Sequence, residues 1–187
     1  MPESIIRDDS VKLIVFFILL TAGILNAQDS YKIVIDEKSQ KPMLLGVSGI
    51  EAFKDSSFSK WFDEEFNSYK INIDDIECIS EEDLDIDLTI IMGTWCSDSR
   101  RETPRLIKIL DILNYPLNNV KFINVNRDKK DLNGEIEKLS IEFVPTFIFS
   151  RDGKELGRII EAPEETLEID SQKIIGCTEK KESSFNY

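Results

Sequence analysis

The stretch Gly93-Thr94-Trp95-Cys96-Ser97-Asp98-Ser99 decides the fold. It follows the apolar run DLTIIM, residues 87–92, which is typical of a buried strand, and it opens residues 97–113, where apolar side chains recur at helical spacing. Cys96 is therefore predicted in the first turn of a helix. There, unpaired backbone N–H groups and the positive end of the helix dipole favour a thiolate over a thiol. In an open α/β sheet, ligands bind at such a strand-to-helix junction.

The sequence after this junction predicts a mixed sheet. Strand–helix–strand crossovers of this length imply parallel strands, and a hairpin after them adds antiparallel ones. The fold class expected is α/β, with a central mixed β-sheet flanked by helices on both faces. The further strands are predicted over 120–125, 146–149 and 155–160, with a turn at 151–153, and the further helices over 132–140 and 164–175.

Residues 28–84 are predicted to be a mostly helical N-terminal extension. Within it, YKIVI (31–35) is compatible with an edge strand, whereas residues 53–69 and 73–84 space their apolar side chains as helices do. No linker separates this extension from the block that follows, so we expect one domain body, with a polar tail over residues 178–187.

The N-terminus carries an apolar run, LIVFFILLTAGIL, over residues 13–25. This run is shorter than the about 20 residues that span a bilayer core, and Ala27 precedes polar sequence as a signal-peptidase site requires. We therefore predict a signal peptide over residues 1–27 and an exported chain, periplasmic or extracellular. Acidic residues outnumber basic ones before the run, so a retained anchor and a buried core helix remain alternatives, and a membrane partner is expected only for the anchor.

Composition excludes several functions. The 187 residues carry a formal net charge of -13 and no histidine. Such a charge repels a phosphate backbone, so no nucleic-acid partner is expected. Without histidine, and without closely spaced cysteines, a zinc site is not expected, and the acidic runs lack the pattern of a calcium loop. We expect neither metal nor cofactor, so the chemistry is left to carboxylates, lysines and three cysteines.

Over about residues 85–175 the chain resembles the thioredoxin-like superfamily, and most of all secreted thioredoxin-like proteins of Bacteroidetes-type bacteria. Trp95-Cys96 stands where the family has its tryptophan and attacking cysteine, and Pro104 where its helix has a proline. Val144-Pro145-Thr146 matches the family's cis-proline loop. The resemblance implies a thioredoxin-like domain over 85–177, with Cys96 as nucleophile. It also implies that Trp95, Val144 and Pro145 bind an extended client.

Two positions depart from the family pattern. Ser99 replaces the resolving cysteine, giving a C-x-x-S motif, and Ile90 replaces a buried acidic residue. A serine cannot break a mixed disulfide, so an external thiol must do so. We expect monothiol or isomerase-type thiol–disulfide exchange with impaired dithiol reductase turnover, in which Ser99 hydrogen-bonds the Cys96 thiolate. The partners expected are client thiols or disulfides and an external thiol or redox partner.

The alternative function, from a different class, is a non-catalytic thioredoxin-fold module. Such a module would bind extended polypeptide beside Trp95 and Pro145 in a chaperone-like or interaction role.

Cys78 and Cys177 leave three possibilities open, because an odd number of cysteines in an exported chain leaves at least one thiol free or paired between chains. In the first, Cys78 is a buried unpaired residue and Cys177 an exposed tail residue. In the second, the two form a structural disulfide with each other, and in the third Cys78 serves Cys96 as a displaced resolving cysteine.

Overall fold

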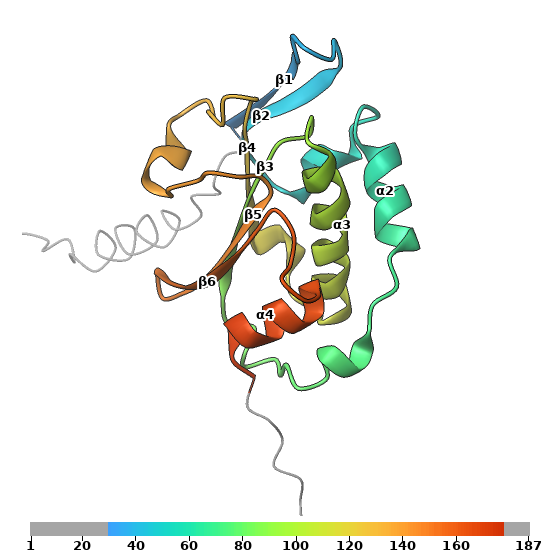
Figure 1. Ribbon diagram of the computed structural model, residues 1–187, viewed down its shortest axis with the longest axis vertical. Coiled ribbons are helices and arrows are strands. Elements are labelled where there is room, and N and C mark those ends of the chain that lie inside the picture. Colours follow the sequence, from blue (N-terminus) through green and yellow to red (C-terminus); the bar gives the residue numbers. More distant parts are fainter. Residues whose placement is uncertain (1–29, 178–187) are drawn as a thin grey trace, which may run out of the picture.

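The structure, a computed structural model, describes residues 30–177 (Figure 1). The predicted signal peptide and the predicted polar tail lie outside the described residues. Within residues 30–177, no helix is both long enough and apolar enough to cross a membrane.

A six-stranded sheet forms the centre of the molecule, in the order β1-β2-β4-β3-β5-β6. β3 and β4 are parallel and all other neighbours are antiparallel, so the predicted mixed α/β sheet is confirmed. The bounds are β1 Ser30–Ile35, β2 Pro42–Ser48, β3 Asp87–Met92, β4 Val120–Asn124, β5 Thr146–Arg151 and β6 Lys154–Ile160.

The α-helices α2 (Ser59–Ser68), α3 (Ser97–Ile112) and α4 (Leu167–Ile175) lie on one side of the sheet (Figure 1). Side chains of β3 alternate between the two faces, as a pleated strand requires. Leu88, Ile90 and Met92 enter the large core beneath the helices, whereas Ile91 joins a smaller cluster on the opposite face. Ile90, at the family's acidic position, is therefore an ordinary core residue with no exposed surface.

The second face is covered differently from the prediction. Residues 132–140 were expected to form a helix, but only a short 3-10 helix, η4 (Glu135–Lys138), is present. The carboxylate of Asp131 accepts hydrogen bonds from the backbone N–H groups of Asn133, Glu135 and Ile136, and Gly134 adopts a left-handed φ of 74°. These local bonds replace the helical pattern, so a loop closes this side of the sheet.

The mostly helical extension is also corrected by the structure. The edge strand predicted over 31–35 is β1, but residues 42–48 form a second strand, β2, that pairs with β4. Gly46 has a φ of 104°, and a Cβ there would lie 2.3 Å from the Ser30 carbonyl oxygen, so only glycine fits the hairpin. The rest of the extension contains η1 (Ile50–Lys54), α2 and η2 (Ile73–Asp75), less helix than the sequence predicts.

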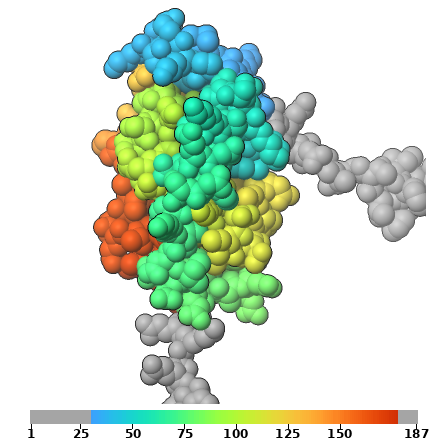
Figure 2. Space-filling view, turned by 90° about the vertical axis from the view of Figure 1, so that its right-hand side faces the viewer, coloured from blue at the N-terminus to red at the C-terminus, as the bar shows by residue number. Residues whose placement is uncertain are grey.

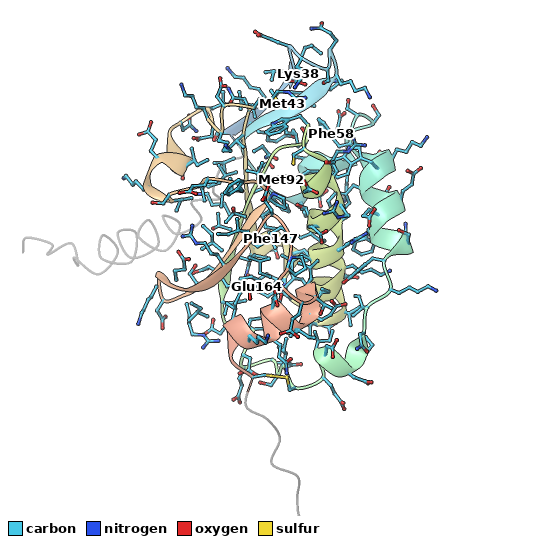
Figure 3. The ribbon with its side chains drawn as sticks, viewed as in Figure 1. Lys38, Met43, Phe58, Met92, Phe147 and Glu164 are labelled. Carbon is cyan, nitrogen blue, oxygen red and sulfur yellow. A yellow bond between two sulfur atoms is a disulfide. The ribbon has the colours of Figure 1, made fainter. Side chains whose placement is uncertain are left out.

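A disulfide joins Cys78 to Cys177, with Cα atoms 5.7 Å apart (Figure 3). It ties the turns after η2 to the end of α4, where Gln172 Nε2 also donates to Cys78 Sγ at 2.8 Å. The structural disulfide is thus the pairing found. Cys78 is therefore neither unpaired nor a resolving cysteine for Cys96, and Cys96 is the free cysteine among the described residues.

The disulfide is expected to stabilise the fold by restricting the unfolded chain, because it joins residues 99 positions apart. The double variant Cys78→Ser, Cys177→Ser should lower the free energy of unfolding by about 2–5 kcal/mol. Denaturant unfolding followed by tryptophan fluorescence measures this. Cys96→Ser is the control and should leave the free energy close to that of the wild type. Equal stability of all three proteins would contradict a stabilising role for the disulfide.

Candidate functional site

The turn between β3 and α3 places Cys96 at the start of the long helix. Cys96 is the N-cap residue of α3, with extended backbone angles of -88° and 130°. Its N–H donates to the Gly93 carbonyl at 2.8 Å, and the Leu44 N–H of β2 donates to Thr94 Oγ1 at 3.1 Å. The partly exposed thiol therefore lies on a turn that is fixed by one hydrogen bond within the turn and by another from β2.

Trp95 lies against the backbone of Gly93. A Cβ at Gly93 would come within 2.5 Å of the indole, so any larger residue would displace the ring. The indole Nε1 donates to the Val125 carbonyl at 2.8 Å, at the end of β4. Trp95 is thus fixed in a half-buried position directly beside the thiol.

The loop before β5 faces Cys96. The Val144–Pro145 peptide bond is cis, and Cys96 Sγ donates to the Val144 carbonyl oxygen at 3.4 Å. Thr146 Oγ1 donates to the Phe143 carbonyl at 2.8 Å, which holds the loop from inside. Val144 and Pro145 are buried, whereas Phe143 is 46% exposed next to them. The structure therefore brings Trp95, Cys96, Val144 and Pro145 together.

Ser99 has a different partner from the one expected. Its side chain has no exposed surface, and its Oγ accepts a hydrogen bond from the Gly93 N–H at 3.2 Å. The hydrogen bond from Ser99 to Cys96 is not among the bonds formed in the described structure. Ser99 instead closes the turn from beneath, so it positions Cys96 through the backbone of Gly93.

Two ion pairs surround the turn that carries the thiol. Asp98, in the first turn of α3, forms an ion pair with Arg101 at 2.8 Å. Arg127 lies over the Trp95 ring, with its Cζ 4.9 Å from the ring centroid, and binds Asp36 through two contacts of 2.8 Å. The Arg127 hydrogen bonds hold the pKa of Asp36 well below its usual range. Asp36 in turn raises the pKa of Arg127, and the nearby Cys96 contributes to that rise.

Sequence reasoning missed Arg127 and Asp36. Arg127 follows β4, and the carboxyl ends of parallel strands share one edge of the sheet. A basic residue directly after the strand parallel to β3 was therefore the available signal. Asp36 had none, because it reaches the site only through the β1–β2 hairpin, which was not foreseen.

The site can perform thiol chemistry. The Cys96 sulfur lies at the N-terminus of α3, where backbone N–H groups stabilise an anion, and it is partly exposed beside the Val144 carbonyl. This position suits a sulfur that attacks a disulfide. Within the described part of the chain, no group of three histidine, cysteine, aspartate or glutamate side chains is placed to hold a metal ion.

Comparison with known proteins gives sequence matches to thioredoxins, although no protein-family model matches the chain. A thioredoxin of Alternaria alternata is 29% identical over 46% of this chain and 67% of its own length. A thioredoxin-like protein of Acanthamoeba polyphaga mimivirus is 32% identical over 37% of this chain and 47% of its own length. The chain thus spans about two thirds of the length of the first relative and about half of the length of the second.

The chain combines a β3-α3-β4 crossover with a β5–β6 hairpin, and both of these sequence relatives are thioredoxins or thioredoxin-like proteins. The fold is thioredoxin-like. Among solved structures, mitochondrial thioredoxin 3 of Saccharomyces cerevisiae is 24% identical, with a TM-score of 0.31 over 41% of this chain and 66% of that one. Thioredoxin O2 of Arabidopsis thaliana is 26% identical, with a TM-score of 0.32 over 52% of this chain and 76% of that one.

Asp36 should make the free energy of unfolding depend on pH. A carboxylate whose pKa is lowered on folding stabilises the protein fully above its unfolded pKa, about 3.9 for aspartate, and loses this effect as the pH falls through the folded value. Asp36→Asn should therefore reduce the free energy of unfolding at pH 7. The difference from the wild type should persist to about pH 5 and shrink in stronger acid.

Urea unfolding at a series of pH values measures this difference. The control is Asp74→Asn, which alters an exposed aspartate of η2 and should follow the wild-type profile. A difference between Asp36→Asn and the wild type that grows as the pH falls below 4 would contradict the assignment.

Proposed function

We propose that the protein catalyses thiol–disulfide exchange through Cys96 alone. The observation that carries the proposal is the state of the sulfur atoms. Cys96 is partly exposed at the start of α3, while Cys78 and Cys177 are bonded to each other. Ser99, at the position of a resolving cysteine, is a buried hydroxyl bonded to Gly93. Cys96 therefore has no second thiol beside it among the described residues.

The reaction begins when the Cys96 thiolate attacks one sulfur of a client disulfide. The client S–S bond breaks, a new bond forms between Cys96 and the client, and the departing client thiolate takes a proton from water. A second thiolate, supplied from outside, then attacks the mixed disulfide and releases Cys96. Each step exchanges one S–S bond for another, so the external thiol decides whether the client is reduced or rearranged.

The loop before β5 provides backbone to which a client can bind beside Cys96. The Val144 carbonyl lies 3.4 Å from Cys96 Sγ, the exposed Phe143 precedes Val144 in this loop, and Trp95 packs against the cluster that contains Val144. An extended client segment can use the backbone there by strand addition, with apolar side chains against the two rings. A client bound in this way presents its sulfur close to Cys96.

We also propose that the protein works after export, with residues 1–27 as the signal peptide. The Cys78–Cys177 disulfide supports this proposal, because structural disulfides form and persist in oxidising compartments and are rare in the cytosol.

The need for an external thiol is tested by Ser99→Cys. A fluorescent cysteine-containing peptide is attached to Cys96 as a mixed disulfide, and excess reagent is removed. The wild type should hold the peptide until dithiothreitol is added, because Ser99 cannot attack sulfur. Ser99→Cys should release it unaided, at a rate independent of protein concentration. Gel filtration with fluorescence detection measures the release.

Two controls accompany this test. Ser99→Ala lacks both thiol and hydroxyl and should hold the peptide as the wild type does, while Cys96→Ser should take up no peptide at all. Unaided release by the wild type as fast as by Ser99→Cys would contradict the single-cysteine mechanism. Failure of the folded wild type to form any adduct would favour a non-catalytic module that only binds polypeptide.

A further inference from the structure

A cavity of about 310 Å³ lies beside Trp95, on the side of the β1–β2 hairpin. It forms where this hairpin meets α2 and the start of α3, the blue, teal and green regions that adjoin at the top of Figure 2. Its size is at the lower end of the range for small-molecule pockets. Its lining includes Lys41, Phe58, Trp61, Thr94, Trp95 and Arg100.

The cavity is cationic in a strongly acidic chain. Arg100 and Lys41 line it, and no aspartate or glutamate does. Within residues 30–177, neither Arg100 nor Lys41 forms an ion pair, whereas Arg101, Arg105, Arg127 and Arg158 all do. On the outer side of Arg100 an adjoining hollow includes Glu64 and Glu65, but Glu65 is bound to Arg105 at 2.6 Å. Two cations thus face the cavity without a carboxylate partner.

Arg100 is held in place one helical turn after Cys96. Its guanidinium Cζ lies 5.1 Å from the centroid of the Trp61 ring, which fixes the side chain against α2. The Arg100 N–H donates to the Cys96 carbonyl at 3.1 Å, in the first turn of α3. Trp95, the residue before Cys96 in the chain, lines the same cavity. The cavity therefore adjoins the turn that carries the thiol, and an anion held by Arg100 lies beside this turn.

We propose that this cavity binds the carboxylate groups of a low-molecular-weight thiol or its disulfide. The inference rests on the proposed exchange function and names the chemical class of the external thiol that Cys96 requires. Arg100 and Lys41 bind the carboxylates, and Phe58 and Trp61 form apolar walls. Val144, the proposed backbone partner of the client, is not among the lining residues, whereas Trp95 borders both the cavity and the client's place.

In each direction, the exchange replaces one S–S bond with another. The Cys96 thiolate attacks one sulfur of the small disulfide, the S–S bond breaks, and one half leaves as a thiolate that is protonated by water. In the reverse direction, the small thiol bound as an anion in the cavity attacks a mixed disulfide on Cys96 and releases the client thiol.

The test compares an anionic and a neutral disulfide on the same sulfur. Cys96 is treated with oxidised glutathione or with 2-hydroxyethyl disulfide at pH 7 and 0.15 M salt, and mass spectrometry follows adduct formation. Arg100→Gln and Lys41→Gln should each lower the rate with oxidised glutathione by about threefold to tenfold. The rate with the neutral disulfide should change less than about twofold, because it does not use the cations.

Two matched variants control for other effects of the substitutions. Arg100→Lys keeps the charge and should retain most of the preference for glutathione. Lys38→Gln removes a charge from the exposed tip of the same hairpin, outside the cavity (Figure 3), and should behave as the wild type.

The outcomes separate the two proposals. Equal losses with both disulfides, or no loss with oxidised glutathione, would overturn the anion site while leaving the exchange function in place. Failure of both disulfides to modify Cys96 in the folded wild type would overturn the exchange function itself.

Discussion

The site depends on one hydrogen-bonded turn, Gly93 to Cys96, between β3 and α3. The Gly93 carbonyl accepts from the Cys96 N–H at 2.8 Å, and the Gly93 N–H donates to the buried Ser99 hydroxyl at 3.2 Å. Gly93 also leaves the space in which the Trp95 ring lies. These contacts decide where α3 starts, and the start of α3 decides that Cys96 meets the helix N-terminus rather than the core. A side chain at Gly93 would move both the tryptophan and the nucleophile.

The N-terminal extension acts on this turn from outside. β2 donates its Leu44 N–H to Thr94, and the hairpin carries Asp36, whose buried carboxylate binds Arg127 above Trp95. The same hairpin and α2 enclose the cationic cavity. The extension is therefore part of the sheet and of the site. With Cys78 and Cys177 bonded to each other, Cys96 is the free thiol of the described residues, and its surroundings come from three separate segments.

Much of the central fold could be predicted from the sequence, because periodicity is a local signal. The apolar run at 87–92, the helix from Ser97 and the hairpin around Gly153 stand in the structure close to where their patterns place them. β2 was missed because Pro42 and Gly46 resemble breakers, and its pairing with β4 is a long-range contact that no local pattern contains. The helix expected over 132–140 does not form, because the Asp131 carboxylate accepts hydrogen bonds from the N–H groups that would begin it.

The site residues Trp95, Cys96, Val144 and Pro145 could be predicted from their motif. Arg127, Asp36 and Arg100 could not, because only the folded structure brings them next to that motif.

The proposed function requires that the fold activates Cys96 for attack on disulfides. It is tested most directly by the rate of adduct formation with 2-hydroxyethyl disulfide at pH 7, measured once on the folded protein and once on the same protein unfolded in urea with its Cys78–Cys177 disulfide intact. Cys96 is then the free cysteine of the sequence in both states. The folded protein should react faster, because the N-terminus of α3 stabilises negative charge on the attacking sulfur. A folded protein that reacts at the same rate as the unfolded chain, or more slowly, would contradict it.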